Sequence, residues 1–183
     1  MDDEALKSFA RESSFPEIHK ILFDSNKIRI EDDFIVFNEE AVNSYTVAIL
    51  ADYFRGEFLA HGMSFSSETV FSHPSKIDLL KNAHHKGFRT YLYFVATESP
   101  EINISRVSSR VGEGGHNVPI DKIVERYQRC LDNVSYALPF LDRGYFFDNS
   151  GTGFHFIAEI ENGEWTLFSS SLPQWFIESI YRK

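Results

Sequence analysis

An almost wholly apolar run, Thr90–Ala96, constrains the fold of this chain more than any other feature of its sequence. Its residues, TYLYFVA, are nearly all β-branched or aromatic, and polar residues do not alternate with them. Such a run is typical of a strand in a parallel sheet whose two faces are both covered. We therefore expect a parallel strand here, with helices on both sides.

Strands and helices alternate around this run. Proline at a helix start and glycine just after a helix end mark the helical segments. The pattern predicts, in order, a strand at Ser64–Val70, a helix at Pro74–Lys86 ended by Gly87, a helix from Pro100 to Val111, a helix over 119–138 and a strand at Tyr145–Asp148. Strand–helix–strand connections of this kind build a parallel sheet, which binds ligands at the carboxyl ends of its strands.

Further helices and strands are predicted near the two ends of the chain. Apolar residues on two faces predict a long helix over 41–61, ended by Gly62, and Phe34–Phe37 reads as a short strand. Asn162-Gly163 predicts the turn of a hairpin made of Phe154–Ile160 and Trp165–Phe168. A closing helix is expected at Pro173–Tyr181. We predict a single α/β domain, residues 1–183, with three layers and a mainly parallel sheet.

Charge and composition limit the function. The net charge of −9 argues against a large nucleic-acid surface, which needs clustered Lys and Arg, although a few converging arginines can still bind a small anion. A single cysteine, Cys130, excludes an intrachain disulfide and a cysteine zinc site, and we predict no metal site built by side chains alone. No run approaches the roughly 20 apolar residues of a membrane helix. We expect a soluble, cytoplasmic protein that binds neither nucleic acid nor membrane.

Three arginines form the main candidate site. Arg106 and Arg110 lie four residues apart on one helix face, where an anion between them would relieve their repulsion. A glycine-rich loop, residues 112–116, follows, and Arg126 lies on the next helix. One interpretation is a lid whose arginines close over transferring phosphates, because the planar guanidinium pairs phosphate bidentately. The alternative is a solvated helix face with salt bridges to Glu101, Glu113 or Glu125.

Two further groups follow expected strands. Glu68 and Thr69 end the strand predicted at 64–70, where a carboxylate can orient a substrate hydroxyl; an edge strand with alternating polar residues is the alternative. Asp148, Asn149 and Ser150 follow the strand at 145–148. They are common turn residues, or they form the rim of a nucleotide-base pocket.

The joint pattern of these segments resembles a known family. SFSSETV, then R-V-x-x-R-V-x-x-G-G-H-x-V-P at 106–119, then ERYQRCLDN and FFDNS, is similar to the zeta-toxin family, in its bacterial branch of predicted small kinases. The resemblance covers about residues 40–150 and extends more loosely to Trp175.

The resemblance implies a P-loop kinase fold that uses ATP and Mg²⁺. Characterised relatives phosphorylate the sugar of UDP-N-acetylglucosamine, and an antitoxin protein is an implied partner. By this resemblance Glu68 and Thr69 bind the acceptor, and Arg106, Arg110 and Arg126 are lid arginines around the phosphates. The remaining implied contacts to the nucleotide come from His116, which stabilises the lid, and from Asp148, Asn149 and Ser150 near the adenine.

The sequence departs from the family in two respects. The family's general-base aspartate lies in an N-x-D segment, and because Asp32 and Asp33 do not lie in that context, the role is not transferred to them. The family begins with a strand and a G-x-x-x-x-G-K-[ST] loop that cradles phosphates, and no such motif occurs in the 183 residues. We expect the native protein to be longer or this stretch to be a fragment, so that Met1 falls after that loop; a decayed gene is the third explanation. The alternative function is a catalytically incomplete module that binds an anion or another protein.

Overall fold

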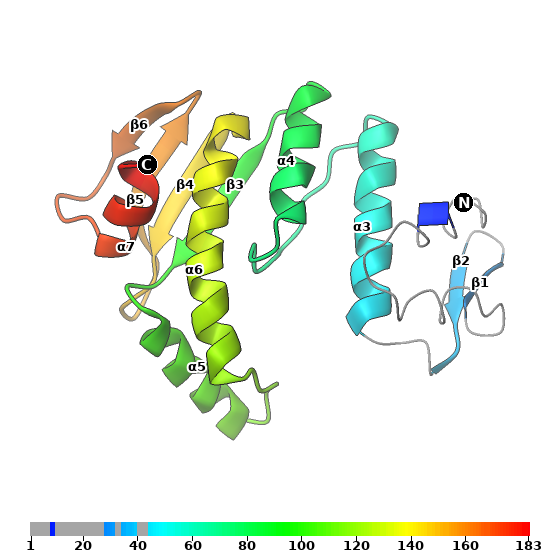
Figure 1. The fold of residues 1–183 in the computed structure, drawn as a ribbon, viewed down its shortest axis with the longest axis horizontal. Helices are drawn as coiled ribbons and strands as arrows, with labels where there is room; N and C mark the ends of the chain where they lie inside the picture. Colours follow the sequence, from blue (N-terminus) through cyan, green and yellow to red (C-terminus); the bar gives the residue numbers. More distant parts are fainter. Residues whose placement is uncertain (1–7, 10–27, 32–33, 40–43) are drawn as a thin grey trace. The chain divides into compact units, whose positions relative to one another are not determined.

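The computed structural model describes residues 8–9, 28–31, 34–39 and 44–183. The chain divides into two compact units, residues 1–66 and 67–183, which are described separately here (Figure 1). The prediction of a single domain stays a prediction.

The first unit holds a two-stranded sheet and one long helix. Strands β1 (Ile28–Glu31) and β2 (Phe34–Phe37) pair antiparallel, which confirms the short strand predicted at 34–37. Helix α3 (Ser44–Ala60) confirms the described part of the predicted helix; residues 41–43 lie outside the described residues. Gly62 ends it as expected, with φ of 70° and the Met63 N–H bonded to the Phe58 carbonyl at 2.8 Å.

The second unit is an α/β structure with a mixed four-stranded sheet. Its elements are α4 (Ser75–His85), β3 (Tyr91–Ala96), α5 (Pro100–Gly112), α6 (Ile120–Ala137), the 3₁₀ turn η2 (Leu138–Phe140), β4 (Arg143–Asp148), β5 (His155–Glu161), β6 (Glu164–Leu167), α7 (Gln174–Phe176) and the π-helical turn η3 (Ile177–Tyr181). Apart from Ser64–Val70, the helices and strands predicted over these residues are confirmed, with small shifts at their ends. The strand order is β3-β4-β5-β6.

The expectation of a mainly parallel sheet is wrong for the described strands. Only β3 and β4 are parallel, whereas β4–β5 and β5–β6 are antiparallel. Connection length explains the difference, because a parallel pair needs a crossover of a dozen residues or more. Helices α5 and α6 provide one between β3 and β4, but the links after β4 and β5 are short. Asn162 and Gly163 make the second link with φ of 50° and 85°, which confirms the predicted hairpin turn.

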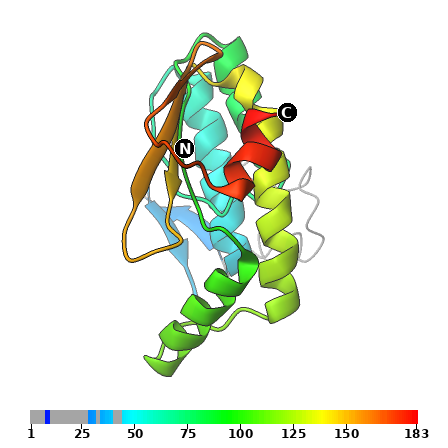
Figure 2. The same ribbon diagram turned by 90° about the vertical axis from the view of Figure 1, so that its left-hand side faces the viewer.

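Helices cover one face of this sheet (Figure 2). Phe146 of β4 is fully buried there, with Phe94 and Ile160 beside it on β3 and β5, and Phe176 packs 5.5 Å from its ring. Helix α6 contributes Leu131, Val134 and Ala137 to the same core. The sheet and these helices make two layers.

The other face of the sheet is open in the described part of the second unit. Tyr91, Tyr93 and Val95 of β3 are 47%, 66% and 45% exposed. The prediction that this strand is covered on both faces is therefore wrong within the described part of the second unit, and the third layer stays a prediction. Sequence pattern cannot reveal this, because an apolar side chain is equally apolar on a covered and an uncovered face.

The strand predicted at Ser64–Val70 does not form. Residues 63–72 have no regular secondary structure, and residues 66–70 are exposed. Polar contacts to α6 replace strand pairing: the Cys130 thiol donates to the Val70 carbonyl at 2.7 Å, and Asn133 Nδ2 to the Phe71 carbonyl at 2.9 Å. Phe71 is buried with φ of 61°, a left-handed conformation that breaks a strand.

Candidate functional site

The loops that follow β3 and β4 meet at the carboxyl end of the parallel pair. The Asn149 N–H donates to the Ala96 carbonyl at 2.7 Å, and the Glu98 N–H donates to Ser150 Oγ at 2.7 Å. The two loops are thus joined by one backbone–backbone bond and one bond from a backbone N–H to a side chain. This is the end of a parallel pair where ligands bind in α/β proteins.

Asp148 stabilises the loop after β4. Its Oδ1 accepts from Ser150 Oγ at 2.7 Å and from the indole Nε1–H of Trp175 at 3.0 Å, while Oδ2 accepts from the Ser150 N–H at 3.2 Å. Trp175 is only 4% exposed, so this carboxylate satisfies a buried donor. Both oxygens of Asp148 have partners within the protein, and a direct contact of Asp148, Asn149 or Ser150 with a nucleotide stays a prediction.

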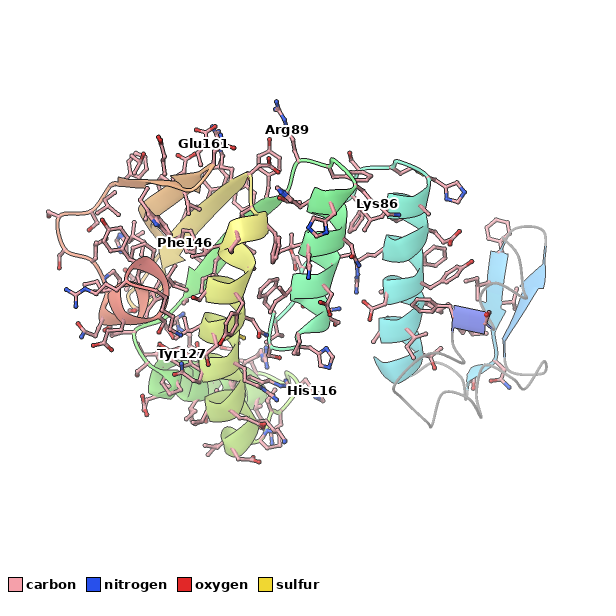
Figure 3. All side chains as sticks on the ribbon, turned by 45° about the horizontal axis from the view of Figure 1, so that its top comes forward. Lys86, Arg89, His116, Tyr127, Phe146 and Glu161 are labelled. Atoms are coloured by element: carbon pink, nitrogen blue, oxygen red, sulfur yellow. The ribbon has the colours of Figure 1, made fainter. Side chains whose placement is uncertain are left out.

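Tyr127 of α6 lies in the same region and contacts the loop after β3 (Figure 3). Its hydroxyl donates to the Thr97 carbonyl at 2.8 Å. Burial, reinforced by the negative charges of Glu98, Asp148 and Glu101, raises the pKa of Tyr127 to about 12. The phenol therefore stays protonated at neutral pH and acts there as a hydrogen-bond donor.

The two arginines of α5 make contacts with different loops. Arg106 donates from a guanidinium nitrogen to the Gly151 carbonyl at 3.0 Å, so it lies over the loop after β4. Arg110 donates to the His116 carbonyl at 3.0 Å, within the glycine-rich loop between α5 and α6. Gly115 in that loop has no room for a side chain, since a Cβ there would lie 2.5 Å from Cγ of Arg110. The exposed His116 thus contacts Arg110 through its backbone.

The predicted site is only partly assembled. Arg106 joins the Asp148–Ser150 loop, but no hydrogen bond links Arg106, Arg110 or the exposed Arg126 to one another or to Glu68 within residues 67–183. Glu68 is exposed, and Thr69 Oγ1 accepts the Phe71 N–H at 3.2 Å. The segment that carries them is fixed to α6 at Cys130, one helical turn after Arg126.

The three arginines form no direct ion pair in the described part of the chain. Within the described ranges no salt bridge joins Arg106, Arg110 or Arg126 to an acidic side chain. Glu125, one of the alternative partners, pairs with Lys122 and Arg129 instead, at 3.2 Å each. A guanidinium bound only to neutral carbonyls can exchange them for an anion.

Sequence reasoning missed several residues of this region. Glu98 directly follows the strand that was predicted at 90–96, so the carboxyl-end rule could have found it; its Oε1 accepts the Gln174 N–H at 3.1 Å. Trp175 gives no such signal, because it reaches Asp148 from a helix 27 positions later in the chain.

The described residues contain no group of three His, Cys, Asp or Glu side chains arranged to hold a metal ion. Magnesium in kinases is held by one or two carboxylates together with substrate phosphates, so an ATP-bound Mg²⁺ would not need such a group. None of the helices in the described ranges combines the length and the apolar character needed to cross a membrane.

Comparison with known proteins gives one informative relative. An uncharacterized protein of Haemophilus influenzae is 34% identical over 65 residues, which make up 36% of this chain and 46% of that protein. The match thus spans less than half the length of this relative. No protein-family model and no solved structure matches the chain.

Proposed function

We propose that this chain is part of an ATP-dependent small-molecule kinase of zeta-toxin type, which phosphorylates a hydroxyl of a sugar nucleotide such as UDP-N-acetylglucosamine. One observation carries the proposal. Arg106, which has no carboxylate partner, contacts the loop after β4 at the carboxyl end of a parallel strand pair, and Arg110 on the same helix has no carboxylate partner either. Positive charge placed around transferring phosphates is most of what a protein supplies to phosphoryl transfer.

In this proposal, which includes a P-loop kinase-like fold, each residue of the predicted site has a role in binding or phosphoryl transfer. Bound ATP would supply the phosphoryl group and leave as ADP, and Mg²⁺ would neutralise charge on the phosphates. Arg106 and Arg110 leave their carbonyl partners and pair with phosphate oxygens, because charge-assisted bonds are stronger than bonds to a neutral carbonyl. Glu68 and Thr69 orient the acceptor hydroxyl, and Arg126 adds positive charge from α6. Tyr127 keeps the loop after β3 in place.

A second candidate function is a non-catalytic module that binds a phosphate-bearing anion or a protein such as an antitoxin. The absence of a G-x-x-x-x-G-K-[ST] loop from the 183 residues favours it, since that loop cradles the nucleotide phosphates in P-loop kinases. Both candidates require the arginines to bind phosphate, and they differ in turnover.

The test separates binding from turnover. Isothermal titration calorimetry with Mg·ATP, pyrophosphate and UDP-N-acetylglucosamine measures binding, and ADP release in the presence of both substrates measures transfer. We expect Arg110→Ala to weaken Mg·ATP binding by about tenfold to a hundredfold. Arg129→Ala is the matched control, because Arg129 is an exposed arginine on α6 that already pairs with Glu125.

The outcomes are distinct. Binding with acceptor-dependent ADP release supports the kinase, and binding without release supports the non-catalytic module. If Arg110→Ala and Arg129→Ala bind Mg·ATP and pyrophosphate as the wild type does, or if nothing binds, the arginine site is wrong for both.

A further inference from the structure

The open face of the second unit's sheet carries a continuous band of aromatic rings. Tyr93 and Tyr145 stack at 4.7 Å across β3 and β4. Tyr145 lies 6.2 Å and Phe147 5.1 Å from Phe156 on β5, and Phe156 stacks on Phe168 at 4.6 Å. We call these five residues the aromatic face. It crosses every strand from β3 to the segment after β6, where the Phe168 N–H still pairs with the Ile157 carbonyl at 2.9 Å.

The aromatic face is a candidate interface because it stays in contact with water. Tyr93 is 66% exposed and Phe168 is 54% exposed, and Tyr91 and Val95 extend the same surface along β3. A contiguous apolar patch of this kind is rare on a monomer unless it binds something. Parallel strands such as β3 and β4 almost always have helices on both faces, and the described helices of the second unit pack on one face.

Acidic residues border the aromatic face at one end. Directly paired residues lie on the same face of a sheet, so the pairs Tyr145–Glu159, Arg143–Glu161 and Glu161–Glu164 place three carboxylates beside the rings. One guanidinium, Arg143, pairs with Glu159 at 3.1 Å and with Glu161. Arg89 and Asp142 line the same cavity as Arg143 and Glu161, so four carboxylates stand against two guanidiniums; the border stays acidic, and the whole chain carries −9.

We propose that the aromatic face docks an amphipathic α-helix of a partner protein, with an apolar stripe against the rings and Lys or Arg residues against Glu159, Glu161 and Glu164. A helix fits because helices are the elements that cover parallel strands. Basic residues fit because they complement the acidic border and the net charge, which also accelerates encounter. This surface lies on the face of the sheet opposite α6, and it does not depend on the proposed kinase activity.

The test uses two synthetic helical peptides with the same leucine stripe and either lysines or glutamates on the polar face. Fluorescence anisotropy with the whole protein gives the affinities. We expect the lysine peptide to bind at least about tenfold more tightly than the glutamate peptide, and the difference to shrink as salt rises. Tyr93→Ser and Phe168→Ser should each weaken lysine-peptide binding by about tenfold, since aromatic anchors dominate such interfaces.

Two further variants sharpen the result. Tyr136→Ser is the matched control, because Tyr136 is 68% exposed on α6, away from the sheet, and should bind as the wild type does. Glu164→Lys should weaken the lysine peptide several-fold and favour the glutamate peptide. Far-ultraviolet circular dichroism checks that every variant remains folded.

The proposal is overturned if neither peptide binds, if both bind equally, or if Tyr136→Ser weakens binding as much as Tyr93→Ser. Sedimentation that shows a dimer of this chain, abolished by Tyr93→Ser, would make a second copy the occupant instead. Binding of single-stranded RNA that depends on the same tyrosine would likewise replace the helix.

Discussion

The two ends of the parallel pair β3–β4 are built alike but differ in their charges. At the amino end the Asp142 carboxylate accepts the Thr90 N–H at 2.7 Å, and Arg143 pairs with two glutamates. At the carboxyl end Asp148 likewise accepts a backbone N–H, that of Ser150. Arg106 at this end donates to the neutral carbonyl of Gly151 and pairs with no carboxylate. The same scaffold thus carries a balanced guanidinium at one end and an unbalanced one at the other.

The difference shows which end can bind an anion. A cavity of about 230 Å³ lies at the amino end, and it is lined by Arg89, Tyr91, Asp142, Arg143, Glu161 and Asn162. An anion there would have to displace carboxylates from Arg143 and would meet their repulsion. At the carboxyl end it would displace only a neutral carbonyl from Arg106, although the carboxylates of Glu98, Glu101 and Asp148 also lie near that end. Access to an arginine without a carboxylate partner therefore favours the carboxyl end over the cavity at the amino end.

The largest effect on anion binding is expected when a carboxylate is placed beside Arg106. Gly151 has open space where a Cβ would be and needs no left-handed backbone, so Gly151→Asp fits. The new carboxylate should balance Arg106 as Glu159 balances Arg143, and weaken Mg·ATP or pyrophosphate binding by about a hundredfold, or ~2.7 kcal/mol. Calorimetric titration measures this loss.

Gly151→Asn is the control for that experiment, since it has the same shape without the charge. It should bind within a factor of about three of the wild type. Equal losses for the two variants would mean that the side chain blocks the site sterically, and no loss for either would remove Arg106 from the binding site.

The second prediction concerns the carboxylate that the carboxyl end does possess. Asp148→Ala removes the acceptor for Trp175 Nε1–H, which is buried, and for Ser150. An unsatisfied buried donor costs about 2 kcal/mol, so urea denaturation should show a loss of that size. Asp148→Asn retains an acceptor oxygen and should lose less than half as much. Equal stability of Asp148→Ala and wild type would contradict the structural role given to this side chain.

The sequence predicts the scaffold of this comparison well. The period of apolar residues, Pro100 and the Asn162-Gly163 turn locate the helices, the strands and the hairpin, because these signals act over a few residues. The α/β class follows from their order. The strand predicted at 64–70 does not form, because Asn133, far along the chain, donates to the carbonyl of Phe71, which has a left-handed backbone conformation.

The candidate site is predicted less well, for a related reason. The carboxyl-end rule points to Asp148 and would also point to Glu98, whereas the arginines are singled out by their spacing on the helices. Trp175 and the carbonyl partners of Arg106 and Arg110 depend on tertiary contacts that no local pattern encodes. Charge balance is such a property too, because the salt-bridge partners of Arg143 are 16 and 18 positions away.

The third prediction is a pH dependence at the amino end. The Thr90 N–H, helped by its hydroxyl and by His84 and Arg89, lowers the pKa of Asp142 against a smaller effect of burial. A lowered folded-state pKa stabilises the protein at pH values above the unfolded-state pKa of about 3.9. This stabilisation is lost as the pH falls through the folded-state pKa.

The measurement compares wild type with Asp142→Asn by urea denaturation from pH 3 to pH 8. The difference in unfolding free energy should be constant from about pH 5 to pH 8 and shrink below about pH 4; solvent screening keeps it under about 1 kcal/mol. A difference that grows as the pH falls would give the opposite sign and contradict the role of the Thr90 N–H.

The smallest effect is expected from the balanced guanidinium itself. Arg143 is 34% exposed, and its partners Glu159 and Glu161 are 20% and 51% exposed, so Arg143→Met should cost only about 0.5 kcal/mol. A double-mutant cycle with Glu159→Gln measures the pair directly by chemical denaturation. A coupling above about 1.5 kcal/mol would show that the amino end needs its ion pairs for folding, and charge balance would then say nothing about ligands. A small coupling leaves electrostatic compensation as the main difference between the two ends, because the fold then gains little from pairing Arg143 and loses little by leaving Arg106 unpaired.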